Sequence, residues 1–130
     1  MKMEHIGLQV QDPVQMSAWY SRNLGFRVMR QQEKSPFTAF LADSSGSVML
    51  EIHHHLDVMV PEYRQMDPLV LHLAFDVGHE PIEAASRRLI QAGAVLAKDL
   101  VVSPAGDKLM MLRDPWGLAV QLVKRAQAMI

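Results

Sequence analysis

The sequence predicts an α+β fold built from two copies of one β-α-β-β-β module. Two observations support this prediction: an internal repeat, and one helix signal among strand-like runs in each half of the chain. The repeat is anchored at four places that follow one another in the same order. These anchors pair residues 4–10 with 71–77, 23–25 with 91–93, 41–43 with 112–114, and 48–52 with 118–122.

The first half contains the expected signals of one module. Residues 3–10 alternate apolar and polar side chains, which predicts a half-buried strand. Asp12 followed by Pro13 is typical of a helix start, and Gly25 is typical of a helix end. The apolar residues of this helix are Met16, Trp19, Tyr20 and Leu24, and three further strands are expected at about 26–31, 36–42 and 47–53.

The second half repeats this order of one strand, one helix and three strands. We expect a strand at 69–77 and then a helix that Pro81 opens and Gly93 ends. The expected apolar stripe of this helix is Ile82, Ala85, Leu89 and Ile90, and the remaining strands are expected at about 94–100, 107–113 and 117–124. The chain is therefore predicted to be a single domain, 1–130, with a first module at about 1–55, a hinge at about 56–68 and a second module at about 69–126.

The composition excludes several classes of protein. The 130 residues are 49% hydrophobic and 21% charged, which is ordinary for a globular domain. Lys plus Arg is 13 and Asp plus Glu is 14, which gives a net charge of −1. Since no positive surplus is available to neutralise phosphates, we expect no nucleic acid partner. There is no cysteine, which excludes disulfides and thiolate metal sites. Without a signal peptide or an apolar run of membrane-spanning length, we expect a cytoplasmic protein that has no membrane partner.

Four polar residues stand at equivalent places in the repeat. In each strand concerned, alternation sets the polar residue on the face opposite the apolar row. These residues are His5, Glu51, His72 and Gln121. Two imidazoles, one carboxylate and one amide oxygen suit a divalent metal ion, provided that the two modules bring their strands to a shared cleft.

Plainer interpretations stand beside this one. A single histidine on a strand is more often a hydrogen-bonded surface or core residue than a ligand. His53 lies on the face of Glu51 and is an alternative ligand, although the run 53–55 favours a partly exposed loop. The segment 114–117 favours a turn before the last strand.

The order and spacing of these motifs resemble the vicinal oxygen chelate superfamily, which includes glyoxalase I, bleomycin-resistance proteins, methylmalonyl-CoA epimerase and extradiol dioxygenases. The resemblance implies two β-α-β-β-β modules that form a cupped mixed sheet. It also implies a homodimer with sites at the interface between chains, and metal ligands at His5, Glu51, His72 and Gln121. The residues that carry it are 4–10, Trp19-Tyr20, Leu24-Gly25-Phe26, 50–52, His72, 114–117 and Gln121-Leu122.

Glyoxalase I is the nearest activity that the resemblance suggests. It implies a lyase or isomerase that chelates two neighbouring substrate oxygens and moves a proton through an enediolate-type intermediate, with nickel, zinc, cobalt, manganese or iron as the ion. The fourth family ligand is a carboxylate in bacterial glyoxalase I, whereas this chain has Gln121, so Glu51 becomes the expected catalytic base. Gln9 stands where glyoxalase I usually has an arginine for glutathione.

Two other functions remain open within the resemblance. Gln121 and the 10 methionines favour a non-catalytic protein that binds a small molecule such as an antibiotic. An extradiol dioxygenase is disfavoured, because its iron-binding carboxylate usually lies on the last strand, at the position of Gln121.

Overall fold

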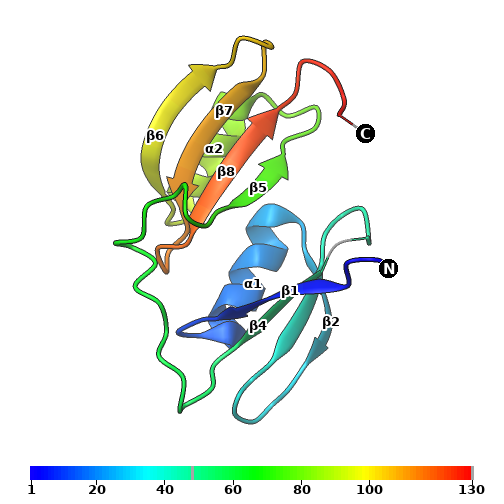
Figure 1. Cartoon of the computed structure of the whole chain (residues 1–130), viewed down its shortest axis with the longest axis vertical. Coiled ribbons are helices and arrows are strands. Elements are labelled where there is room, and N and C mark those ends of the chain that lie inside the picture. Colours follow the sequence, from blue (N-terminus) through cyan, green and yellow to red (C-terminus); the bar gives the residue numbers. More distant parts are fainter. Residues whose placement is uncertain (48, 130) are drawn as a thin grey trace. The chain divides into compact units, whose positions relative to one another are not determined.

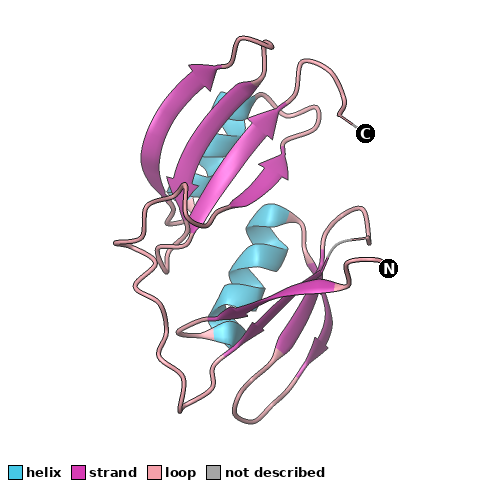
Figure 2. Ribbon diagram, in the orientation of Figure 1, coloured by secondary structure: helices cyan, strands magenta, loops and turns pink. Residues whose placement is uncertain are grey.

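The computed structural model describes residues 1–47 and 49–129, and it divides into two compact units, Met1–Pro61 and Glu62–Ile130. Val48, which the sequence predicts within the fourth strand, lies outside the described residues. Each unit has one helix on one face of a four-stranded sheet (Figures 1 and 2).

The first unit has the order β-α-β-β-β. In its sheet, β1 and β4 are parallel neighbours, and the other pairs are antiparallel, in the order β1-β4-β3-β2. The elements are β1 (His5–Gln9), α1 (Pro13–Leu24), β2 (Arg27–Gln31), β3 (Ala39–Ala42) and β4 (Met49–His53).

The second unit repeats this order and topology. Its sheet has the order β5-β8-β7-β6, and again only the first and last strands of the module, β5 and β8, pair in parallel. The elements are β5 (Leu73–Asp76), α2 (Ile82–Gln91), β6 (Val95–Val102), β7 (Lys108–Arg113) and β8 (Ala119–Lys124). The α+β class and the two β-α-β-β-β modules are thus confirmed.

The pairing register shows how closely the two modules correspond. Gly7 pairs with Glu51 in the first sheet, and Ala74 pairs with Gln121 in the second. Even an irregularity is repeated, since the register shifts between Val28 and Arg30 on β2 and between Leu96 and Lys98 on β6. This agreement confirms the repeat inferred from the sequence.

The first helix forms as its local sequence predicts. The Asp12 carboxylate accepts a hydrogen bond from the Gln15 backbone N–H at 2.9 Å, Pro13 occupies the first turn, and Gly25 ends the helix with a φ of 75°. The helix buries Met16 and Tyr20 against the sheet. The sheet in turn buries the apolar row of β4, Leu50 and Ile52, which leaves Glu51 on the other face.

Two expectations for the second module were wrong. The strand predicted at 69–77 begins only at Leu73, because Asp67 forms a turn: its carboxylate accepts from the Leu69 N–H at 2.8 Å and its carbonyl from the Val70 N–H at 2.9 Å. Ile90, predicted in the buried stripe of α2, is 41% exposed. The buried row is instead Ile82, Ala85, Ser86 and Leu89, the i, i+3, i+4, i+7 pattern of one helix face.

The segment 114–117 is the predicted turn. The buried Asp114 carboxylate accepts hydrogen bonds from the N–H groups of Trp116 and Leu118, each at 2.9 Å. Gly117 has a φ of 98°, and a Cβ placed there would lie 2.8 Å from the Arg64 backbone nitrogen. The turn therefore requires glycine for its dihedral angle and for the close approach of residue 64.

Replacing Gly117 with alanine should destabilise the protein more than the same change at Gly78. Both glycines have positive φ, so both variants carry a strain of about 1–2 kcal/mol, but nothing lies within 4 Å of a Cβ at Gly78. The clash with Arg64 should add about 1–3 kcal/mol at position 117 only. Urea denaturation followed by circular dichroism measures this difference, and equal midpoints for the two variants would contradict it.

Asp107 should stabilise the fold in a pH-dependent manner. Its carboxylate accepts from the Ala126 N–H at 2.9 Å and from Arg125 at 2.7 Å, and these interactions hold the Asp107 pKa below its ordinary value of 3.8. A lowered pKa means that the stabilisation is complete above the unfolded-state pKa and is lost as the pH falls through the folded-state pKa. Urea denaturation over a pH series should therefore show Asp107→Asn less stable than the wild type near neutral pH, with the difference shrinking towards acid. Asp57→Asn, the same change at an exposed loop position, is the control, and equal pH dependence in the two variants would contradict the prediction.

Candidate functional site

The open face of the first sheet carries the first pair of predicted ligands. His5 lies on β1 and Glu51 on β4, and His5 Nε2 is 3.0 Å from Glu51 Oε2. The other carboxylate oxygen, Oε1, is 3.6 Å from Nδ1 of His53. Glu51 therefore lies between two imidazoles; the Glu51 and His53 side chains are half-buried, whereas His5 is exposed.

Gly7 leaves the space that the carboxylate occupies. It pairs with Glu51 across the parallel strands, and a Cβ on residue 7 would lie 3.3 Å from Glu51 Oε2. Phe40 of β3, the neighbour of Glu51 on its other side, contacts the His5 ring edge-on with 5.7 Å between the centroids. Gly7 thus leaves room for the carboxylate, and Phe40 contacts one of the two imidazoles.

The other nitrogen of His5 determines what Nε2 can do. Nδ1 is hydrogen-bonded to the Glu4 carboxylate, so Nε2 faces Glu51. If Nδ1 carries the proton, Nε2 and Oε2 are two acceptors 3.0 Å apart, an arrangement that needs a cation between them. A second proton on His5 supplies that cation in the protein alone, and the hydrogen bond that His5 Nδ1 donates to the Glu4 carboxylate, followed by the charges of Glu4 and Glu51, raises the pKa of His5. A proton and a metal ion would therefore compete for one position.

The three consecutive histidines have different environments. His53 is the last residue of β4, and its Nδ1 is buried and has no hydrogen-bond partner among the described residues. His54 Nδ1 is bonded to the Val10 carbonyl at 2.8 Å, and the His55 ring contacts the His53 ring. Of the three, His53 alone reaches Glu51, as the alternative interpretation of the sequence expected.

Gln9 has a role that the sequence did not indicate. Its side-chain amide donates to the carbonyls of His55 and Val58, each at 2.8 Å, and accepts from the His55 N–H at 3.0 Å. It thereby holds the loop after β4 against the end of β1. Only the parallel register, which pairs Gln9 with His53, reveals this contact, since the partners are 46 and 49 residues away.

The second module carries the other two predicted ligands. Gln121 on β8 pairs with Ala74, the position that corresponds to the Gly7–Glu51 pair. His72 lies just before β5, and its Nδ1 is 2.7 Å from the Pro68 carbonyl. A carbonyl can only accept, so Nδ1 carries the proton and Nε2 of the neutral ring keeps its lone pair.

Of the four predicted ligands, the structure shows contact between the two of the first module. The structure brings His5 and Glu51 into contact and adds His53, which was only an alternative. Within residues 1–47 and 49–129, no group of three or more His, Cys, Asp or Glu side chains has an arrangement that would hold a metal ion. That His72 and Gln121 join His5 and Glu51 around one ion stays a prediction.

Comparison with known proteins identifies the family. The model of the Glyoxalase/Bleomycin resistance protein/Dioxygenase superfamily matches residues 2–122, so the chain belongs to this superfamily. Among curated proteins, the comparison found no match. No helix in the part of the chain that the structure describes is long and apolar enough to cross a membrane.

Solved structures show the same fold at low sequence identity. A glyoxalase family protein from Bacillus cereus aligns with a TM-score of 0.80 and 16% identity over 98% of this chain and 95% of its own. TnmS3, an antibiotic binding protein from Streptomyces sp. CB03234, aligns with a TM-score of 0.73 and 17% identity over 97% of each chain. A superfamily member from Sphaerobacter thermophilus aligns with a TM-score of 0.73 and 16% identity over 96% of this chain and 98% of its own. These likenesses establish the fold, which leaves the function to the chemistry of the site.

Proposed function

We propose that the chain is a glyoxalase-type lyase or isomerase that depends on a divalent metal ion and acts on a small substrate with two neighbouring oxygen atoms. The observation that carries the proposal is the contact of His5 Nε2 with Glu51 Oε2 at 3.0 Å, on the open face of the first sheet. Superfamily membership supports the same class of chemistry.

The donor atoms fit a divalent ion. His5 and His72 both use Nδ1 in a hydrogen bond, to a carboxylate and to a carbonyl respectively, and this leaves Nε2 of each ring for a metal. The proposed ligands are these two nitrogens, the Glu51 carboxylate and the Gln121 amide oxygen. Nickel, zinc, cobalt, manganese and iron all accept such a mixed nitrogen and oxygen set.

Glu51 is the proposed base. When bound, the ion would act as a Lewis acid on the substrate oxygens. A neutral amide cannot take up a proton at neutral pH, so Gln121 acts only as a ligand. Glu51 accepts the proton from one substrate carbon and returns it to the neighbouring carbon. His53, 3.6 Å from the second oxygen of Glu51, would hold that carboxylate in position.

Metal content tests the proposal. Protein purified without an affinity tag and loaded with Zn²⁺ or Ni²⁺ should hold about one ion per proposed site. Glu51→Ala and His72→Ala should each weaken binding by about 100-fold or more, since each removes a ligand. Gln121→Glu should tighten it, because a carboxylate is a better ligand than an amide. Calorimetry and elemental analysis give these values.

His79→Ala is the matched control for His72→Ala, because His79 is an exposed histidine of the same unit. It should leave the metal affinity unchanged within about twofold. Equal affinity in the wild type, Glu51→Ala and His72→Ala proteins would overturn the proposed ligand set.

We further propose that the chain acts as a homodimer in which each site takes His5 and Glu51 from one chain and His72 and Gln121 from the other. Mixing Glu51→Ala with His72→Ala protein and allowing the chains to exchange should then restore metal binding, because half of the sites in a mixed dimer contain no substitution. If each chain supplied its own four ligands, both sites of a mixed dimer would remain defective. Native mass spectrometry with Zn²⁺ distinguishes these outcomes, and a monomeric mass would contradict the proposal.

A non-catalytic small-molecule binder is the second candidate. Gln121 favours it, because an amide opposite Ala74 supplies hydrogen bonds without a second acid or base. The likeness to TnmS3, named as an antibiotic binding protein, agrees with this alternative. Such a protein would bind its ligand equally well before and after treatment with a chelator, whereas the proposed enzyme would lose its activity.

A further inference from the structure

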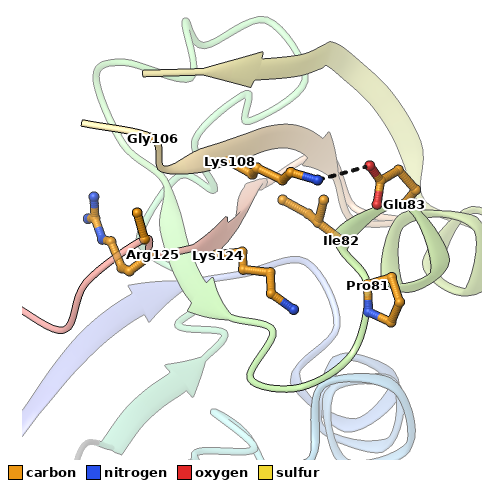
Figure 3. Close-up of a pocket in the computed structure, with 8 residues that line it drawn as sticks. Pro81, Ile82, Glu83, Gly106, Lys108, Lys124 and Arg125 are labelled. Atoms are coloured by element: carbon orange, nitrogen blue, oxygen red, sulfur yellow. Dashed lines mark ion pairs between the residues drawn. The ribbon is translucent and has the colours of Figure 1, made fainter. Parts of the chain in front are cut away.

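A concave site lies within the second unit, at the beginning of α2. It is a cavity of about 300 Å³ (Figure 3). Its walls come from the start of α2, the start of β7, the end of β8 and the residues next to these strands. The lining residues are Pro81, Ile82, Glu83, Gly106, Lys108, Lys124, Arg125 and Ala126.

The two lysines lie directly opposite each other. Lys108 pairs with Lys124 across the antiparallel strands β7 and β8, so their side chains leave the same face of the sheet. Like charges in this arrangement repel and destabilise a sheet. Side chains alternate along β8, so Lys124 and Gln121 lie on opposite faces of the sheet. Lys124 lies on the face that α2 covers (Figure 1).

The charges around the lysines are only partly balanced. Lys108 Nζ lies 3.7 Å from a Glu83 carboxylate oxygen, and both side chains are nearly half exposed, so this ion pair is weak. Lys124 Nζ donates to the Glu80 carbonyl at 3.4 Å, and no carboxylate of the described residues is within ion-pair distance of it. Figure 3 shows Lys108 reaching toward Glu83 and Lys124 toward Pro81.

The remaining walls add positive potential and apolar surface. Helix α2 begins at Ile82, and Pro81 before it makes no side-chain capping hydrogen bond. The first turn carries Glu83, whose carboxylate accepts a hydrogen bond from its own backbone N–H, which lowers the Glu83 pKa, so this carboxylate offsets part of the positive potential of the helix start. Arg125 stands at the rim and is held by Asp107 at 2.7 Å. Pro81, Ile82 and Ala126 supply apolar surface.

We propose that this cavity binds a small organic phosphate, with the phosphate group between Lys108 and Lys124 and the organic part against Ile82. Two ammonium groups and a helix start suit a dianion with three exposed oxygens. A volume of about 300 Å³ exceeds that of a phosphate group alone. An anion between the lysines also offsets the repulsion between their two positive charges.

The first module lacks this feature at the equivalent positions. Counted from the equivalent pairs Met111–Gln121 and Phe40–Glu51, Lys108 and Lys124 correspond to Phe37 and His54, which lie just outside β3 and β4. The His54 ring is bonded to the Val10 carbonyl and Phe37 carries no charge, so these positions hold no pair of lysines. The basic pair therefore belongs to the second module and is no consequence of the repeat.

Thermal unfolding and calorimetry with phenyl phosphate test the proposal, at a buffer concentration of about 10 mM, where screening is weak. Phenyl phosphate should raise the melting temperature of the wild type, and phenol should not. Lys124→Met should weaken phenyl phosphate binding by about tenfold or more, and it should raise the melting temperature without ligand because it removes the like-charge pair.

Two further variants sharpen the test. Glu83→Gln should tighten phenyl phosphate binding, because it frees Lys108 and removes a competing negative charge. Lys98→Met, an equal change of charge at an exposed position on β6, should alter binding by less than about twofold. The proposal is overturned if Lys98→Met and Lys124→Met weaken binding equally, if Glu83→Gln does not tighten it, or if phenol stabilises as well as phenyl phosphate.

Discussion

The parallel pairing of the first and last strands of each module is the constraint on which the rest of the structure depends. Side chains alternate along β4, so burying Leu50 and Ile52 beneath α1 forces Glu51 to the opposite face, beside His5. A slip of one residue would turn this carboxylate into the core, at a cost of several kcal/mol, and would expose the apolar row. Core packing and site geometry are therefore set by one register, which Gly7 permits because it leaves space beside the Glu51 carboxylate.

The two modules share that register but differ in the polar side chains on the open face of the sheet. In the first module a carboxylate contacts imidazoles on the open face, whereas in the second a neutral amide takes the equivalent place. The histidines are oriented differently too, by the Glu4 side chain in one case and by the Pro68 carbonyl in the other. Folding requires only the apolar rows, so the polar positions are free to differ. Of the two equivalent positions 51 and 121, only 51 carries a carboxylate, which is why Glu51 is the expected base.

The sequence predicts those parts of the molecule that local physics determines. Alternation gives the faces of His5 and Glu51, and a cap, a first-turn proline and a terminal glycine give α1. Tertiary contacts decide the rest. The hydrogen bonds of Gln9 join residues far apart in the chain, and the Asp67 turn shortens β5, although its residues read as a continuation of the strand. His53 reads as part of a solvated tract until the end of β4 is known.

Lys124 shows why the basic cavity is not apparent from the sequence. It continues the row of Val120 and Leu122 on the face that α2 covers, but it stands at the strand end, where α2 begins. A lysine at a strand end usually indicates a solvated residue. The cross-strand register changes that interpretation, because it sets Lys108 directly opposite Lys124 at the start of α2, where Glu83 is the one carboxylate within ion-pair distance of either lysine among the described residues. A pair that weakens the sheet and adds nothing to its core is best explained by an anion that both lysines bind.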